Sequence, residues 1–362
     1  MLGVLATLYR DYPRAKLDIK LVVEADDSVT IEALAALSPG PQFQVLVAPP
    51  GFPRTKPRAL NLALPFARGE MLVVYDAEDE PDAGQLRAAA ACFAAAGPEL
   101  ACLQAHLIID NCDDTWLTRL FALEYAALFD VINPGFANLR LPFPLGGTSN
   151  HFRTAALRAL SGWDAWNVTE DADLGIRLGR RGLVAATVRS TTHEEAPAEL
   201  GAWLAQRCRW FKGWLQTLIT HSRHPVRFFT DLGLARGAAV AVLLISTLLG
   251  ALLGPLLFAL TLHQAVFGRL FHPDSVLGFI VAGFALTLCL GGAANVIWPA
   301  VLGMRARGLA HLAPWMALLP VYYLLMSIAA WAALIDLWRR PFAWAKTEHG
   351  LAKSSLRKKR RA

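Results

Sequence analysis

Three long apolar tracts in the last third of the chain restrict its fold more than any other feature. They run over residues 235–262, 276–302 and 312–338. Each is longer than the twenty or so residues that cross the hydrocarbon layer of a bilayer. A soluble core rarely needs three tracts of this length with so little charge. The sequence therefore predicts insertion into a membrane.

The charge between the tracts leaves the number of crossings open. The loop 303–311 carries Arg305, Arg307 and His311, so it should face the cytoplasm together with the globular part of the chain. Three full crossings would then place the basic C-terminus on the opposite side. Either one tract is re-entrant, with a break at Pro320, or a crossing is miscounted.

The first 230 residues have the pattern of a globular α/β protein. Strands are predicted over residues 17–24, 43–47, 70–75 and 100–109, with helices over 29–37, 56–67 and 85–96. This alternation predicts a doubly wound, mostly parallel sheet. In such sheets ligands bind at the carboxyl ends of the strands. The chain opens with a helical pattern over 1–9 instead of a strand, so we expect the usual first strand to be absent.

Two further helices have compositions typical of a membrane surface. Residues 116–132 are apolar around most of the helix, and residues 200–219 place Trp203, Trp210 and Trp214 at helical spacing among basic side chains. Tryptophan on one side and positive charge on another suit the lipid interface. An ordinary core-facing helix explains the second pattern equally well.

Composition narrows the class of protein. The net charge of +6 includes a basic run over 356–361, which next to apolar tracts is expected to contact anionic lipid rather than nucleic acid. The five scattered cysteines suggest neither disulfides nor a zinc site, so a reducing compartment fits. Because Arg10 and Asp11 interrupt the early apolar stretch, no cleavable signal peptide is expected.

Acidic side chains follow the strand predicted over 70–75. Asp76, Glu78 and Asp79 lie within four residues. Phosphates repel carboxylates unless a divalent cation lies between them, and Mg²⁺ or Mn²⁺ prefers oxygen ligands. A solvated acidic turn is the alternative. Lys56 precedes a predicted helix, where its charge could meet a phosphate.

A second acidic motif begins a helix. Glu170 and Asp171 follow Thr169, with Arg180 and Arg181 near the end of the pattern and Gly182 as its stop. Acids first and bases last suit the helix dipole. Asp171 is therefore expected at a pocket rim, where a carboxylate could take a proton from a hydroxyl. For Asp171 taken alone, an ordinary N-terminal helix acid is the favoured interpretation, and the other motifs of the chain reverse this preference.

Three side chains share one face of the helix predicted over 200–219. Gln206, Arg209 and Trp210 lie at positions i, i+3 and i+4. An amide, a cation and an indole on one face could hold a diphosphate and cover a sugar ring.

In this order, the motifs resemble the inverting family 2 glycosyltransferases of the membrane-bound cellulose synthase and hyaluronan synthase type. The resemblance covers roughly residues 1–350 and implies a GT-A-like fold. It implies the following roles: Asp26 at the base or ribose, Lys56 at the diphosphate, Asp76 and Glu78 at nucleotide and metal, Asp171 as general base beside Glu170, Gly147, Thr148 and Ser149 at the acceptor, and Gln206, Arg209 and Trp210 at diphosphate and acceptor.

The implied function is inverting transfer of a sugar from a nucleotide sugar to a growing polysaccharide at the cytoplasmic face of a bacterial inner membrane. A UDP-sugar is the first candidate for the donor. Single transfer to a lipid acceptor and an inactive scaffold subunit are the alternatives, and an accessory export subunit is a further candidate partner. The expected division is a catalytic domain over 1–198, an interfacial region over 199–231, membrane helices over 232–340 and a basic tail over 341–362.

Two departures from the family pattern matter. Glu78 stands where the usual pair has a second Asp, which keeps a carboxylate on a longer arm. The absence of the first strand predicts weak donor binding or low stability.

Overall fold

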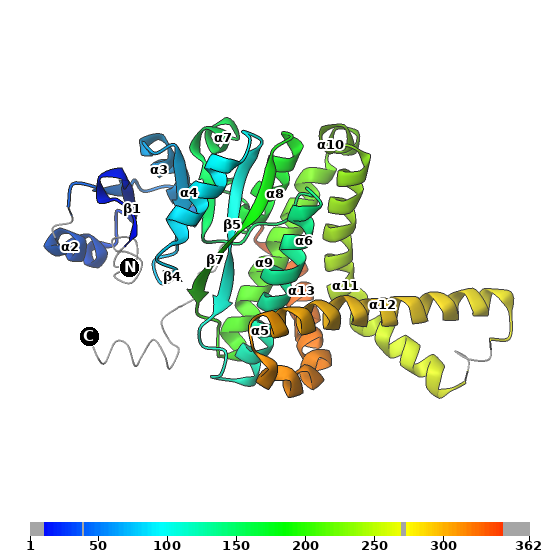
Figure 1. Ribbon diagram of the computed structural model, residues 1–362. Coiled ribbons are helices and arrows are strands. Elements are labelled where there is room, and N and C mark those ends of the chain that lie inside the picture. The colour runs from blue at the N-terminus through cyan, green and yellow to red at the C-terminus, as the bar shows by residue number, and fades with distance from the viewer. Residues whose placement is uncertain (1–10, 38–39, 269–272, 343–362) are drawn as a thin grey trace.

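The computed structural model describes residues 11–37, 40–268 and 273–342. It contains a small sheet, a larger five-stranded sheet and a helical region (Figure 1). The helix predicted over 1–9 and the basic run over 356–361 lie outside the described residues.

The small sheet is built from the first two described strands. After a short 3₁₀ turn (η1, Arg14–Lys16), β1 (Ile19–Glu24) and β2 (Phe43–Ala48) pair in parallel, joined through α2 (Ser28–Leu37). Among the described residues, neither strand is hydrogen-bonded to the larger sheet. The pair lies apart from it at the left of Figure 1.

The larger sheet has the strand order β3-β6-β5-β7-β4. Its strands are β3 (Met71–Val74), β4 (Glu80–Pro81), β5 (Leu100–Ile109), β6 (Asn150–Arg153) and β7 (Val184–Glu194). Strands β5 and β7 are parallel, whereas β3–β6, β5–β6 and β4–β7 are antiparallel. The apolar run of β5 is almost entirely buried at the centre.

The α/β class predicted from sequence is confirmed, but the large sheet is more mixed than "mostly parallel". The two antiparallel strands, β4 and β6, have two and four residues. Strand β4 is too short to show a pattern, and β6 lacks the apolar run by which the four-residue β3 was predicted. The four strands and three helices that were predicted here all appear, with ends shifted by up to a few residues.

Helices flank the strands and set the motifs in place. They are α3 (Lys56–Ala63), its 3₁₀ continuation η2 (Leu64–Phe66), α4 (Gln85–Ala95), α7 (Thr154–Ala159) and α8 (Glu170–Arg180). Helix α8 begins with its acids and ends before Gly182, whose φ of +73° is the left-handed conformation that glycine adopts readily. The predicted stop is therefore confirmed.

The three apolar tracts form long helices. They are α11 (Leu234–Val266), α12 (Val276–Ala306), and α13 (Leu319–Arg339), which follows the 3₁₀ segment η4 (Ala310–Leu318). Pro320 lies in the first turn of α13, where the helix type changes. A fourth stretch, Trp116–Asn138, is also long and apolar enough to cross a bilayer. It comprises α5 (Trp116–Ala127), the π-helical turn η3 (Leu128–Ile132) and α6 (Asn133–Asn138).

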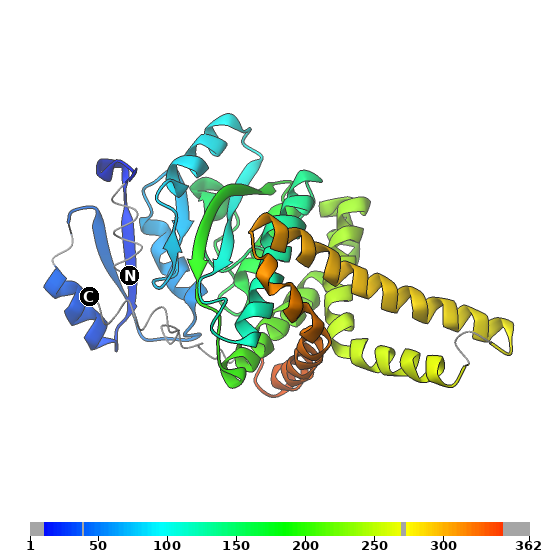
Figure 2. The same ribbon diagram turned by 60° about the horizontal axis from the view of Figure 1, so that its bottom comes forward.

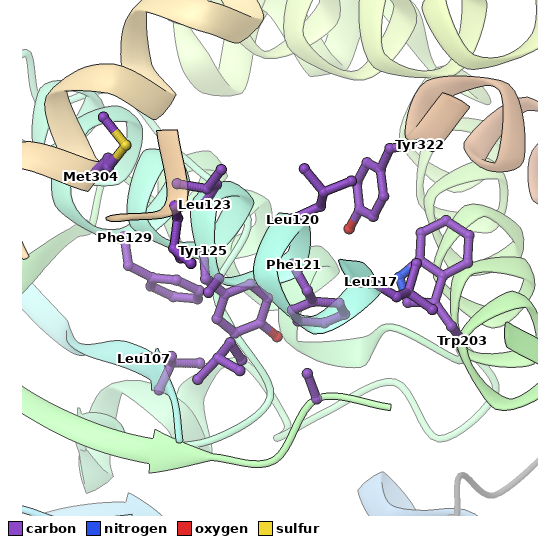
Figure 3. Packing of buried hydrophobic residues seen from close by; sticks show 14 of the residues in the cluster. Leu107, Leu117, Leu120, Phe121, Leu123, Tyr125, Phe129, Trp203, Met304 and Tyr322 are labelled. Carbon is purple, nitrogen blue, oxygen red and sulfur yellow. The ribbon is translucent and has the colours of Figure 1, made fainter. Parts of the chain in front are cut away.

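The helical region has its own core. Buried side chains of α5 pack against α9 (Leu200–Ser222), α12, η4 and α13, as Figure 3 shows for Leu120, Phe121, Trp203 and Tyr322. The short α10 (Pro225–Leu232) joins α9 to α11. Helices α11 and α12 then project from the body as a hairpin (Figures 1 and 2). Their side chains there are largely exposed, as expected for a surface that faces lipid.

Candidate active site

Lys56 connects two of the predicted motifs. It is the first residue of α3, and its Nζ donates to the Asp76 carboxylate and, over 2.6 Å, to the carbonyl of Gly147. Burial lowers the pKa of Lys56, but the charges of Asp76 and Glu170 outweigh it and raise the pKa above its usual value. The ammonium is thus held as a cation between the end of β3 and the turn before β6.

The turn at residues 147–149 is fixed by buried hydrogen bonds. The Asp76 amide donates to Thr148 Oγ1 over 3.2 Å, and Ser149 Oγ lies 2.6 Å from Thr192 Oγ1. Gln104 Nε2 donates to the Thr148 carbonyl over 3.0 Å. The side chains of Thr148 and Ser149 are buried in these contacts, so Gly147 is the member of the turn that adjoins the carboxylates.

Asp171 lies beside this turn. A methyl group built on Gly147 would lie 3.2 Å from Asp171 Oδ2 and 4.0 Å from Lys56 Nζ, which places the three groups in one small volume. Burial raises the pKa of Asp171. Burial and the Asp171 charge together raise the pKa of Glu170 to about 8, while Lys56 opposes the change. The motif therefore holds two crowded carboxyls next to a cation.

Helix α9 supplies a second cation. Burial lowers the pKa of Arg209, and the charges of Glu170, Asp171 and Asp76 oppose this, which places the guanidinium near the same carboxylates. The helices approach closely, because a methyl group on Gly213 would lie 2.2 Å from Thr169 Oγ1. Gln206 is buried, and its Oε1 has no hydrogen-bond partner among the described residues.

Trp210 has different surroundings from those the sequence indicated. Its ring centroid lies 6.0 Å from that of Phe121, and the Arg207 guanidinium lies 4.5 Å from the indole. These contacts are with α5 and with the side chain one turn earlier on the same side of α9. Trp210 thus packs against the helical core next to the carboxylate cluster.

Asp26 makes its contacts away from the group of residues around Lys56 and Asp171. It follows β1 in the small sheet, is exposed, and pairs with Arg54 at 2.5 Å. Arg54 also approaches Glu24 at 4.0 Å. The structure therefore joins Lys56, Asp76, Gly147, Glu170, Asp171 and Arg209, but it does not bring Asp26 into contact with them.

Two carboxylates that the sequence analysis did not assign to the site also face it. Asp79 is buried, its Oδ2 lacks a hydrogen-bond partner among the described residues, and burial with the Asp76 charge raises its pKa to about 8. Glu194 ends β7, and burial and the Asp79 charge raise its pKa. Its place at a strand's carboxyl end was a usable signal, but β7 was not predicted.

The carboxylates fit a divalent cation only in part. The described residues contain no group of three His, Cys, Asp or Glu side chains arranged as a metal site. Glu78 is exposed, whereas Asp79 offers an unpartnered buried oxygen next to Asp76. Hard oxygen donors of this kind suit Mg²⁺ or Mn²⁺, provided that the diphosphate completes the ligand set.

Comparisons with known proteins identify the family of this chain. Residues 71–272 match the profile described as glycosyl transferase family group 2. The chain belongs to this family and is a glycosyltransferase with membrane helices.

Individual relatives match at different extents. Beta-monoglucosyldiacylglycerol synthase from Synechocystis is 26% identical over 94% of this chain and 70% of its own length. Probable glucomannan 4-beta-mannosyltransferase 1 from Arabidopsis thaliana is 28% identical over 40% of this chain, which spans 26% of that protein.

A solved structure shows the same fold. It is the mannosyltransferase from Pyrobaculum calidifontis in complex with GDP-Man and Mn²⁺, with a TM-score of 0.55 and 21% identity over 93% of this chain and 83% of that one. At this identity, the likeness concerns the fold alone.

Proposed function

We propose that this glycosyltransferase moves a sugar from a nucleoside diphosphate sugar to a hydroxyl acceptor, with inversion at the anomeric carbon. A UDP-sugar is the first candidate for the donor. The observation that carries the proposal is the placement of two cations, Lys56 and Arg209, next to the carboxylates Asp76 and Asp171. Cations suit the leaving diphosphate, and a carboxylate beside them can receive the acceptor proton.

In this proposal the cations and the metal act on the leaving group. Lys56, Arg209 and Gln206 would hold the diphosphate, whose charge grows as the sugar departs. Asp76 and Glu78 would hold Mg²⁺ or Mn²⁺, and Asp79 offers a further oxygen. The bound ion would neutralise negative charge on the diphosphate.

Asp171 would be the general base. Burial raises its pKa toward the range in which a carboxylate accepts protons effectively near neutral pH. Gly147 leaves room next to the carboxylate, so an acceptor hydroxyl can approach it there. Thr148 and Ser149 would then shape the acceptor turn through their buried hydrogen bonds. Trp210 would border the acceptor, and Asp26 would meet the nucleotide base or ribose.

The acceptor has two candidates. A growing polysaccharide is the first, because the Gln206, Arg209 and Trp210 pattern resembles that of polymerising enzymes. A lipid is the second, because the Synechocystis relative, named for diacylglycerol, aligns with 94% of this chain. We further propose that the catalytic part over 1–198 and the interfacial region over 199–231 face the cytoplasm of a bacterium. The helices over 232–340 would then lie in the inner membrane. If the enzyme polymerises, an export subunit would be its partner.

The test is a screen of UDP- and GDP-sugars against the purified full-length chain, with diacylglycerol vesicles or oligosaccharides as acceptors. We expect nucleotide release that requires a divalent cation. Asp171→Asn should lower transfer about 10²–10⁴-fold and preserve UDP affinity. A radiolabelled donor separates the acceptors, since a polysaccharide product grows in length and a glycolipid does not. Full transfer by Asp171→Asn would refute the assigned base.

A further inference from the structure

Helix α9 carries two arginines that face in different directions. Arg207 and Arg209 are two positions apart, which turns their side chains about 200° from each other around the helix. Arg209 shares a helix face with Gly213, four residues later, where α9 meets Thr169 directly before Glu170 and Asp171. Arg207 faces α5 and α13 instead, and it is 2% exposed.

The hydrogen bonds of Arg207 fix its orientation. Its two terminal nitrogens donate to the two oxygens of Glu124 on α5 over 2.6 and 2.7 Å. One of them also donates to the Tyr322 hydroxyl on α13 over 3.0 Å, and Tyr322 in turn donates to Glu124. A bidentate pair of this kind restricts angle as well as distance.

Four aromatic rings surround the same guanidinium. Its central carbon lies 4.4 Å from the ring centre of Phe121, 4.5 Å from Trp210, 5.1 Å from Trp203 and 5.9 Å from Tyr322. Phe121, Trp203 and Tyr322 belong to the core of the helical region in Figure 3. We call Glu124 and these four rings the Arg207 cage. It joins α9 to two of the helices that are candidates to cross the membrane.

We propose that Arg207 is a positioning residue for sugar transfer: its cage fixes the rotation of α9 about its axis and so directs Arg209 at the donor diphosphate. The inference rests on the proposed function, in which Arg209 binds that diphosphate. A lysine at position 207 would keep the charge but not the planar fork, so it could not restrict the helix rotation in the same way. Small misplacements of a binding group can cost about 10²-fold in rate.

A double-mutant cycle distinguishes positioning from plain structural support. The variants are Arg207→Lys, Arg209→Gln and the pair together, in the full-length chain reconstituted in nanodiscs. If Arg207 acts through Arg209, Arg207→Lys should lower kcat/KM about 10–100-fold alone but less than about 3-fold when Arg209 is already Gln. The affinities of the same variants for UDP and GDP provide a second readout for the cycle. This readout does not require an acceptor.

Two further variants complete the design. Arg119→Lys is the matched control, because Arg119 also stacks on an indole, Trp315 at 4.5 Å, and contacts no residue of the candidate site in the described structure. It should change neither rate nor nucleotide affinity. If Arg207→Lys does not fold, Tyr322→Phe keeps the ring and removes two hydrogen bonds from the cage, those of its hydroxyl with Arg207 and Glu124, and it should show the same dependence on Arg209.

The outcomes separate the two proposals. Equal effects of Arg207→Lys with and without Arg209 would overturn the positioning role while leaving the proposed function in place. Arg209→Gln without any loss of nucleotide affinity would instead overturn the assignment of Arg209 to the diphosphate, and the role of Arg207 with it.

Discussion

At the scale of residues, the candidate site is a balance of charges in a small buried volume. Glu170 and Asp171 begin α8, and Lys56 and Arg209 approach them from α3 and α9. Burial and the Asp171 charge raise the pKa of Glu170 to about 8, whereas Lys56 and Arg209 oppose the effect of burial on the pKa of Asp171. Without the carboxyls, the cations would repel each other. Each group therefore depends on its neighbours for its charge state.

This balance predicts an acid limb in the pH profile. A general base works when ionised, so kcat/KM should fall as pH decreases through the apparent pKa of the Glu170–Asp171 pair, which burial raises. Lys56→Gln removes a cation that lowers the pKa of Asp171 and should move this limb to higher pH. The measurement is kcat/KM from about pH 5 to pH 9. A limb at the same pH in both proteins would contradict the coupling.

Chelation tests the cation. EDTA should abolish transfer, and Mn²⁺ or Mg²⁺ should restore it. Glu78→Gln and Asp79→Asn form a matched pair, because each replaces a carboxylate by a neutral amide of nearly the same shape. Glu78 is exposed, whereas Asp79 is buried. If Asp76 and Glu78 hold the ion, Glu78→Gln should raise the metal concentration needed for half-maximal activity about 10-fold or more. No change in that concentration would remove Glu78 from the site.

The residue types of the candidate site could be predicted from the sequence, whereas their contacts could not. Lys56, Asp76, Asp171 and Arg209 were named from short motifs, because the residue types and their positions at strand and helix ends are visible in one dimension. Asp79 and Glu194 were not assigned, since their burial depends on how β7 meets the loop after β3. The separate position of Asp26 depends on a sheet pairing that no motif encodes.

At the scale of elements, the site depends on how closely α9 approaches the start of α8. Gly213 makes this approach possible, because any side chain there would overlap Thr169. The sequence predicted α8 and α9 with ends within a few residues, since both have clear helical periodicity. Their mutual packing was not predictable, because one glycine in a helix gives no indication of its neighbour.

Gly213→Ala should therefore displace α9. A methyl group would lie 2.2 Å from Thr169 Oγ1, so we expect lower activity and a loss of stability of about 1–3 kcal/mol. Gly201→Ala on the same helix meets nothing within 4 Å and serves as the control. Thermal unfolding and kcat/KM are the measurements. Equal behaviour of the two variants would show that the helices do not touch in this way.

At the scale of the whole molecule, the α11–α12 hairpin is the main surface available to lipid. The three apolar tracts were predictable because length and composition alone define them. The fourth candidate, Trp116–Asn138, was expected along the membrane surface. It is half buried over its most apolar window. Its position relative to the bilayer stays a prediction.

A charge in the hairpin should weaken insertion. Leu290 lies near the middle of α12 and is 67% exposed, and a lysine near the middle of a spanning helix costs about 2.5–3.5 kcal/mol. We expect Leu290→Lys to increase the fraction that alkaline carbonate extracts from membranes. Val29→Lys is the control, at a position 77% exposed on α2 of the small sheet. Equal extraction of both variants would mean that the hairpin is not embedded.

The way α12 joins the body has a consequence for its surroundings. A methyl group on Gly303 would lie 2.4 Å from the backbone of Ala126, so α12 touches α5 main chain to main chain, two residues from Glu124. Helix α12 has 31 residues and spans about 46 Å, whereas a typical hydrocarbon layer is about 30 Å thick. Thicker or thinner lipid changes the tilt of such a helix. A change in the tilt of α12 would shift α5 at this contact, so turnover should depend on the acyl chain length of the lipid.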